Sequence, residues 1–150
     1  MMISTKGRYA LRLMIDLAQH NTGDCVPLKE ITRRQGISEK YVEAIVAVLV
    51  KGRLIAGQRG KGGGYRLTRL PDAYTAWEIL EQMEGSLAPV TCLESGAPPC
   101  FRAASCTTLP LWRQLHSAIR HCLEGITLAD LAAGKPLPGE LDSKEGEAKA

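Results

Sequence analysis

Three of the five cysteines in this chain of 150 residues lie in one segment that has no helical or strand periodicity. Cys92, Cys100 and Cys106 are separated from one another by seven and five residues. Thiolates are soft ligands for iron and zinc, and neighbouring thiols also form reversible disulfides. The paired C-x2-C spacing that is usual in zinc sites is absent from this segment. From the residues alone, an iron–sulfur cluster, a zinc site and a thiol switch all remain open.

The composition of the chain indicates where these thiols would act. Hydrophobic residues make up 45% of the chain and charged residues 23%, as in an ordinary soluble domain. No apolar run approaches the roughly 20 residues of a membrane-spanning helix, and no signal-peptide core follows the N-terminus. We therefore expect a cytoplasmic protein with no membrane partner, whose cysteines are thiols or ligands rather than structural disulfides.

A run of glycines and cations is the second feature with a chemical interpretation. Residues 59–64 read RGKGGG. Tyr65 stands where the last glycine of a dinucleotide-binding fingerprint would be, and no Gly-Lys-Ser/Thr completes a phosphate-binding P-loop. Two short extended pieces, 54–58 and 65–69, flank the run. We therefore predict a β-hairpin with a positively charged tip.

Charge is divided unevenly along the chain. Residues 1–70 contain 13 Lys and Arg against 5 Asp and Glu, a net charge of +8. Residues 71–150 contain 6 against 11, a net charge of −5. A basic half joined to an acidic half is typical of a nucleic-acid-binding module with a separate regulatory part.

The elements that precede the hairpin predict a helix-turn-helix. A first helix begins near Ser4 or Thr5. A short second helix has Pro27 in its first turn and stops at Gly36. Ser38 is expected to cap a third helix, which has an apolar stripe at helical spacing: Tyr41, Val42, Ile45, Val46 and Leu49. Two helices joined by a short turn and followed by a hairpin form a winged helix-turn-helix, so we predict a mainly α fold with a small β-wing.

The second helix of a helix-turn-helix enters the major groove of DNA with its first residues. Lys40 would reach guanine or phosphate, Glu43 would accept from a cytosine amine, and the cations of the hairpin tip would contact phosphates or the minor groove. The expected DNA-binding residues are Lys6, Ser38, Glu39, Lys40, Tyr41, Glu43, Arg59 and Lys61. Further backbone contacts are expected from Arg8, Arg33 and Arg34.

The second half of the chain predicts a dimerisation region. A helix over 74–84 is followed by the cysteine segment and by an amphipathic helix over 109–123. The stripe of this helix exceeds the needs of one short domain, so we expect a homodimer interface at Trp112, Leu115, Ile119 and Cys122. Cys122 lies on the apolar stripe, which favours a buried structural thiol. Cys25 lies in a turn, and the sequence indicates no partner for it.

These elements divide the chain into three parts. We predict a winged helix-turn-helix over 1–70, a cysteine loop with the dimerisation helix over 71–134, and a disordered tail over 135–150. A short helix over 127–133 closes the second part.

Four ordered motifs carry a family resemblance. They read STKGRYALR at 4–12, ISEKYVE at 37–43, RGKGGGYRL at 59–67 and, after the cysteine loop, LW at 111–112 with GITL at 125–128. Together they resemble the Rrf2 family of winged-helix regulators, of the IscR, NsrR and CymR type, over about residues 1–134. The resemblance implies a homodimeric bacterial transcription factor that binds double-stranded DNA at a palindromic promoter site.

The resemblance also implies a role for the cysteines. In family members of the cluster type, three loop cysteines hold a two-iron or four-iron cluster whose state changes DNA affinity. A cluster-free thiol or disulfide sensor is the alternative regulator. The rival from another class is a small metal-dependent enzyme or electron carrier, for which no nucleophile–base pair is evident in the sequence.

The chain departs from the family pattern around the cysteines. The first gap contains seven residues, where the family pattern has five. The histidine that follows the last cysteine by three positions in IscR-like members is Leu109 here. Arg8 stands where some NsrR-like members supply an acidic ligand. The cluster type and the fourth ligand are therefore not assigned by the sequence.

Overall fold

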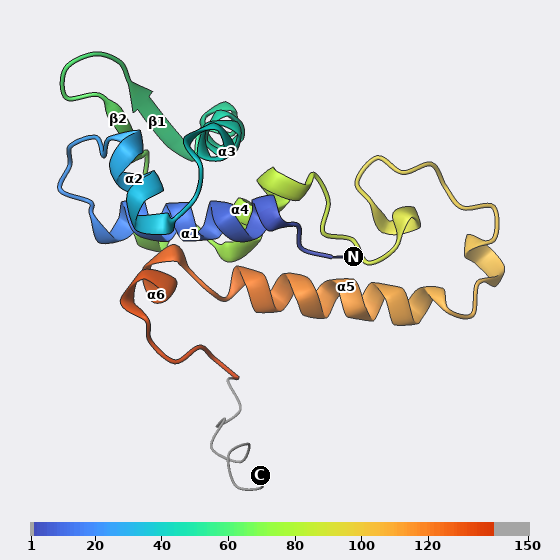
Figure 1. Cartoon of the computed structure of the whole chain (residues 1–150). Helices are drawn as coiled ribbons and strands as arrows, with labels where there is room; N and C mark the ends of the chain where they lie inside the picture. Colours follow the sequence, from blue (N-terminus) through green and yellow to red (C-terminus); the bar gives the residue numbers. More distant parts are fainter. Residues whose placement is uncertain (1, 140–150) are drawn as a thin grey trace, which may run out of the picture.

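The computed structural model describes residues 2–139, to which the structural statements below refer. The helices are α1 (Thr5–Gln19), α2 (Leu28–Gln35), α3 (Glu39–Lys51), α4 (Ala76–Glu84), α5 (Leu109–Glu124) and α6 (Leu128–Ala133). The strands β1 (Ile55–Gln58) and β2 (Gly64–Leu67) form one antiparallel pair. The prediction of a mainly helical fold with a small β-wing is confirmed (Figure 1). Of the predicted tail, residues 140–150 lie outside the described residues, and residues 135–139 contain no helix or strand.

Helix α1 is the central element of the fold. Ser4 is its N-cap and accepts a hydrogen bond from the backbone N–H of Gly7 at 3.1 Å. Apolar residues recur every three or four positions, so α1 buries one stripe of side chains: Ala10, Leu13, Met14 and Leu17. Helices α2, α3, α4 and α6 all pack against α1.

Helices α2 and α3 are joined by the predicted turn. Gly36 ends α2 with a φ of +64°, a left-handed conformation that glycine adopts without strain. Ser38 then caps α3 and accepts from the backbone N–H of Tyr41 at 3.3 Å. The inner face of α3 is fully buried in the core, through Val42, Ile45, Val46 and Leu49. The structure thus contains the predicted helix-turn-helix.

The wing is a hairpin with a third extended segment beside it. In the ladder, Ile55 pairs with Leu67 and Gln58 with Gly64. Val26 forms an isolated antiparallel bridge to Tyr65 on the other side of β2. Gly64 has a φ of +144°, and a Cβ there would lie 2.1 Å from the carbonyl oxygen of Val26. Only a glycine therefore permits this segment to approach the wing so closely.

The base of the wing is held by one buried hydroxyl. Tyr74 is fully buried, and its hydroxyl accepts hydrogen bonds from the backbone N–H groups of Thr68 and Arg69, both at 2.9 Å. The same hydroxyl donates to the carbonyl oxygen of Leu54 at 2.8 Å. Residues on both sides of the hairpin are thereby connected to the core below it.

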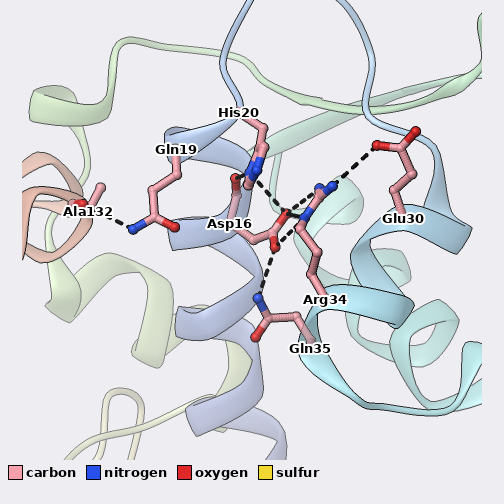
Figure 2. A network of polar contacts seen from close by, with 7 residues as sticks. All are labelled: Asp16, Gln19, His20, Glu30, Arg34, Gln35 and Ala132. Atoms are coloured by element: carbon pink, nitrogen blue, oxygen red, sulfur yellow. Dashed lines mark hydrogen bonds and ion pairs between the residues drawn. The ribbon is translucent and has the colours of Figure 1, made fainter.

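After α5 the chain returns to the winged-helix core. Leu128 of α6 is fully buried in the same hydrophobic cluster as the residues of α1 and α3, and Ile79 of α4 belongs to it as well. Gln19 of α1 donates to the carbonyl oxygen of Ala132 at 3.1 Å, as Figure 2 shows. One core therefore includes residues on both sides of position 70, and the proposed division of the chain at that position stays a prediction.

Helix α5 and the cysteine loop extend away from this core (Figure 1). The inner face of α5 packs on α4, where a second apolar cluster forms around Trp77, Leu80 and Leu87, with Ile119 and Leu123 of α5 against it. Residues 85–108, which connect α4 to α5, contain only two short 3-10 turns, Thr91–Leu93 and Ala103–Ser105. No helix among the described residues is long and apolar enough to cross a bilayer.

Candidate nucleic-acid interface and cysteine loop

Helix α3, along most of its length, the start of α2 and the wing border one open groove of about 610 Å³. Glu39 and Glu43 line its α3 side, one helical turn apart, and Arg59 lines its wing side. Lys40 is exposed beside them on the first turn of α3. The structure therefore brings three of the sequence-predicted residues, Glu39 and Glu43 of the recognition helix and Arg59 of the wing, to the two sides of one groove.

The wing tip presents two cations with no internal partner. Arg59 and Lys61 are exposed, and the ion pairs among residues 2–139 involve neither of them. Gly60 and Gly62 have φ values of +85° and +73°, which most other residues adopt only with strain. The tight glycine-rich turn therefore leaves both charged side chains available for an external anion.

The remaining cations of the predicted surface divide into two groups. Lys6, Arg8 and Arg33 are exposed, as expected for residues that contact phosphates. Arg34 differs, because its side chain is only 22% exposed and pairs with Asp16 at 2.8 Å and with Glu30 at 3.2 Å. The expected phosphate contact by Arg34 is therefore corrected: its guanidinium is occupied inside the protein (Figure 2).

Asp16 is the buried centre of this polar network, with an exposed fraction of 2%. Its carboxylate accepts two hydrogen bonds from Arg34 Nε and Nη2 and a third from Gln35 Nε2 at 2.9 Å. Burial raises the pKa of Asp16, but the hydrogen bonds from Arg34 and Gln35 and the Arg34 charge lower it more, so the pKa lies below its ordinary value. The network ties α2 to α1 by charged hydrogen bonds.

A second set of contacts joins α1 to the turn and to α3. Arg12 donates to the side-chain and backbone oxygens of Gln35, at 3.1 and 3.0 Å, and its guanidinium lies over the ring of Tyr9. The rings of Tyr9 and Tyr41 meet edge to face with centroids 5.7 Å apart. Tyr41, a predicted DNA-binding residue, is thus half-buried and held against α1 from the first turn of α3.

The three loop cysteines are accessible but separate. Cys92 and Cys100 are exposed and Cys106 is half-buried. Within residues 2–139, no three His, Cys, Asp or Glu side chains are gathered as ligands for one metal ion. The structure therefore supplies thiol donors in one loop without a preformed metal cage.

Cys106 has the most distinctive surroundings of the three. Its sulfur lies 3.4 Å from Oγ1 of Thr108, at the start of α5. Hydrogen bonds from this hydroxyl and from the backbone N–H groups of Thr108 and Leu109 lower the pKa of the Cys106 thiol. A lowered pKa favours the thiolate, which is the form that binds metals and reacts with oxidants.

The two other cysteines differ from expectation. Cys122 was expected to be a buried thiol, but it is exposed in the single chain because only the inner face of α5 is covered. Cys25 is half-buried and its thiol lies 3.8 Å from Oε1 of Gln58, next to the wing. This neighbour could not be predicted from the sequence, because a long-range bridge between Val26 and Tyr65 brings the two segments together.

The apolar face of α5 is only partly covered. Leu111 and Leu115 are 56% and 41% exposed. Trp112 and Ile119 are half-buried, and Ile119 lines an apolar cavity of about 370 Å³ together with Leu80 of α4. The face predicted for dimerisation is therefore unpartnered in one chain over much of its length.

The structure also shows important residues that the sequence reasoning did not select. Asp16 follows Leu13 by three positions and so falls on the buried stripe of α1, which marks it as a buried carboxylate that needs a partner. Tyr74 lies at the border of a predicted helix. Nothing in the sequence distinguishes a tyrosine whose hydroxyl bonds the base of the wing from an ordinary core tyrosine. Long-range contacts alone distinguish it.

Comparison with known proteins agrees with these features. Residues 3–134 match the sequence profile of the Rrf2 family, described as an iron-dependent transcriptional regulator. The HTH-type transcriptional regulator IscR of Aliivibrio salmonicida is 40% identical over 131 residues, which cover 87% of this chain and 77% of that protein.

Solved structures give the same result. CymR, the global cysteine regulator of B. subtilis, has a TM-score of 0.72 and 38% identity, over 91% of this chain and 99% of that one. IscR of T. potens has a TM-score of 0.69 and 36% identity, over 89% of this chain and 88% of that one. These relatives are transcriptional regulators rather than enzymes. The chain therefore belongs to the Rrf2 family of winged-helix transcriptional regulators.

Proposed function

We propose that this regulator binds an imperfect palindrome in double-stranded DNA, with residues 38–43 in the major groove and residues 59–64 on the adjacent backbone or minor groove. The observation that carries this proposal is the groove between α3 and the wing, with Arg59 unpaired at its wing side and Lys61 exposed at the wing tip, two residues further along the chain. The carboxylates of Glu39 and Glu43 would accept hydrogen bonds from base amines, and they would repel the phosphates of the DNA backbone. The cations would supply affinity and the α3 residues would supply sequence preference.

A selection experiment tests this DNA-binding mode. The wild-type protein is used to recover duplexes from a random-sequence pool, and the enriched sequence is footprinted. We expect a two-fold-related motif, protected on both half-sites. Recovery of no motif by either the metal-free or the iron-loaded protein would refute sequence-specific regulation by this surface.

The partner across the palindrome is proposed to be a second copy of the chain, docked along α5. Support comes from the exposed Leu111 and Leu115 and from the incomplete cover over Trp112, Ile119 and Cys122. Leu115→Glu would place a charge in such an interface, so light scattering is expected to show monomers. Gln114→Glu is the matched control, because Gln114 is an exposed polar neighbour on the same helix. A Leu115→Glu variant that stays dimeric would place the interface elsewhere.

The ligand proposed for the loop is an iron–sulfur cluster held by Cys92, Cys100 and Cys106. The donor set fits in chemical type, since three thiolates are the ligands such clusters use, and the family description favours iron over zinc. A bound cluster would supply a redox-sensitive centre. The chain itself contributes a thiolate-favouring position at Cys106 and a loop that must change conformation before its three thiols bind one group.

Iron and acid-labile sulfide in anaerobically purified protein test this assignment. Each of Cys92→Ala, Cys100→Ala and Cys106→Ala is expected to lose both. Cys122→Ala is the matched control because it removes an exposed thiol outside the loop. Protein that lacks iron and accepts none on reconstitution would refute the cluster.

A cluster-free thiol switch is the second candidate, and the lowered pKa of Cys106 favours it. In that case two loop thiols would give two electrons and two protons to hydrogen peroxide, forming one disulfide and two waters. One of the three cysteines would then be dispensable for the response of DNA binding to peroxide, whereas cluster binding requires all three.

A further inference from the structure

One carboxylate fastens the first turn of α1 to the last residue of α4. Glu84 Oε1 accepts hydrogen bonds from the backbone N–H of Ser4 at 2.9 Å and from the Ser4 hydroxyl at 2.7 Å. The two residues are 80 positions apart in the chain. A negative charge at this place also meets the positive end of the α1 dipole. The contact therefore fixes where α1 begins relative to α4.

Gly7 provides the space for this carboxylate. Gly7 is buried in α1 and donates its N–H to the Ser4 side chain. A Cβ at position 7 would lie only 2.2 Å from Glu84 Oε1. Glycine weakens a helix interior, so its presence here is explained by the close approach of Glu84. We call Ser4, Gly7 and Glu84 the α1–α4 clasp.

The α1–α4 clasp lies between the cysteine loop and the DNA-reading surface. Glu84 is the last residue of α4, and Gly85, with a φ of +77°, begins the segment that carries the cysteines. On the other side of the clasp, α1 carries Lys6 and then Tyr9, whose ring packs on Tyr41 in the first turn of α3. A continuous set of contacts thus runs from the end of α4 to the start of the recognition helix.

We propose that Glu84 is a positioning residue that couples the conformation of the cysteine loop to the DNA-reading end of α3. The coupling rests on the proposed function of the loop. A loop conformation that displaces residue 84 separates the carboxylate from Ser4, and the first turn of α1 then moves with Lys6 and Tyr9. Tyr41 loses its edge-to-face partner, so α3 no longer presents its first turn to the base edges in one orientation.

The first test uses reduced, cluster-free protein with two probes, a duplex selected by the wild-type protein and a scrambled duplex of equal length. Glu84→Ala and Gly7→Ala should each weaken binding to the selected duplex about fivefold and leave the scrambled duplex within about twofold. Glu84→Gln keeps an acceptor oxygen for Ser4 and should recover most of the affinity. Glu81→Ala is the matched control, since Glu81 lies on the same helix and bonds Trp77 rather than α1.

The double variant separates coupling from general destabilisation. Gly7→Ala in the Glu84→Ala background should cause no further loss, because the atom that the new Cβ meets is gone. If the double variant instead shows the sum of the two single losses of DNA affinity, Gly7 and Glu84 do not act through one contact, and the α1–α4 clasp is refuted. Thermal unfolding of each variant confirms that only folded protein is compared. If Glu84→Ala does not fold, Gly7→Ala takes its place, because its Cβ displaces the same carboxylate.

The second test measures the ratio of DNA affinities between the two states of the loop. In Glu84→Ala this ratio should fall toward one, whereas Glu81→Ala keeps the wild-type ratio. A wild-type ratio retained in Glu84→Ala would overturn the coupling. A wild-type ratio of one would instead refute the switch proposed for the loop, and the double variant would still decide whether the clasp positions α3.

Discussion

Arg34 donates to both carboxylate oxygens of the buried Asp16, with Nε at 3.0 Å from Oδ2 and Nη2 at 2.8 Å from Oδ1. The pair joins α1 to the first helix of the helix-turn-helix, in the polar network of Figure 2. A basic residue that the sequence offered as a DNA contact is therefore part of the scaffold that orients the reading helix.

Removal of Arg34 should destabilise the fold strongly. Arg34→Met leaves the Asp16 carboxylate buried with Gln35 as its main remaining donor, and breaking a buried pair in this way costs about 3 kcal/mol. Urea unfolding measures the loss. Arg33→Met is the matched control. Arg33 is exposed on the same helix, so this substitution should change the free energy of unfolding by no more than about 0.5 kcal/mol. Equal effects of the two substitutions would contradict a structural role for Arg34.

The contribution of this pair should depend on pH. The pKa of Asp16 in the folded protein is lowered by Arg34 and Gln35 against the effect of burial, so the unfolded state binds the proton more readily. The stabilisation is therefore complete above the unfolded pKa of about 3.9 and is lost as pH falls through the lower folded value. The stability difference between wild type and Arg34→Met should be largest near neutral pH and shrink below about pH 4. A difference independent of pH would refute this assignment.

Tyr74→Phe should loosen the wing without disturbing the apolar core. The substitution removes the hydroxyl that connects Leu54 with Thr68 and Arg69, and two backbone N–H groups lose their acceptor. We expect a loss of about 2 kcal/mol in unfolding free energy and faster hydrogen exchange at those two amides. Tyr65→Phe is the control, because its hydroxyl makes no hydrogen bond within the described residues. Unchanged exchange in Tyr74→Phe would show that the hydroxyl does not hold the wing.

The two cations of the wing tip should affect DNA binding in different ways. Arg59 lines the groove, so Arg59→Ala should weaken binding to the selected duplex by about 1–3 kcal/mol and relax its sequence preference. Lys61→Ala should weaken selected and scrambled duplexes alike and lower the slope of log K against log salt by about one. Lys135→Ala, an exposed cation beyond α6, is the control. Identical effects of Arg59→Ala and Lys61→Ala would mean that neither residue reads sequence.

The local elements of this fold could be predicted because their causes lie within a few residues. Ser4 and Ser38 cap the helices that follow them, and Gly36 ends α2, since each of these effects involves a backbone group three or four positions away. The wing was predicted for the same reason, from a glycine-rich turn between two extended pieces. The residues offered to DNA, apart from the half-buried Tyr41 and Arg34, are indeed exposed.

The ends of the wing strands show where local reasoning fails. The sequence predicted strands over 54–58 and 65–69, but the ladder runs over Ile55–Gln58 and Gly64–Leu67. The carbonyl of Leu54 and the N–H groups of Thr68 and Arg69 bond the Tyr74 hydroxyl instead of each other. The Tyr74 hydroxyl therefore takes the backbone groups that would have extended the ladder between β1 and β2.

By itself the sequence determined the helices, the wing, the family and a loop with three thiols. Only the tertiary structure decided that Arg34 is occupied by Asp16, that α6 returns to the core of α1, and that Glu84 meets Ser4. The physical reason is that a charged or polar side chain looks the same in the sequence whether it faces water or a partner. The partner is chosen by burial, which makes an unpaired group costly, and by packing between segments as far as 80 residues apart.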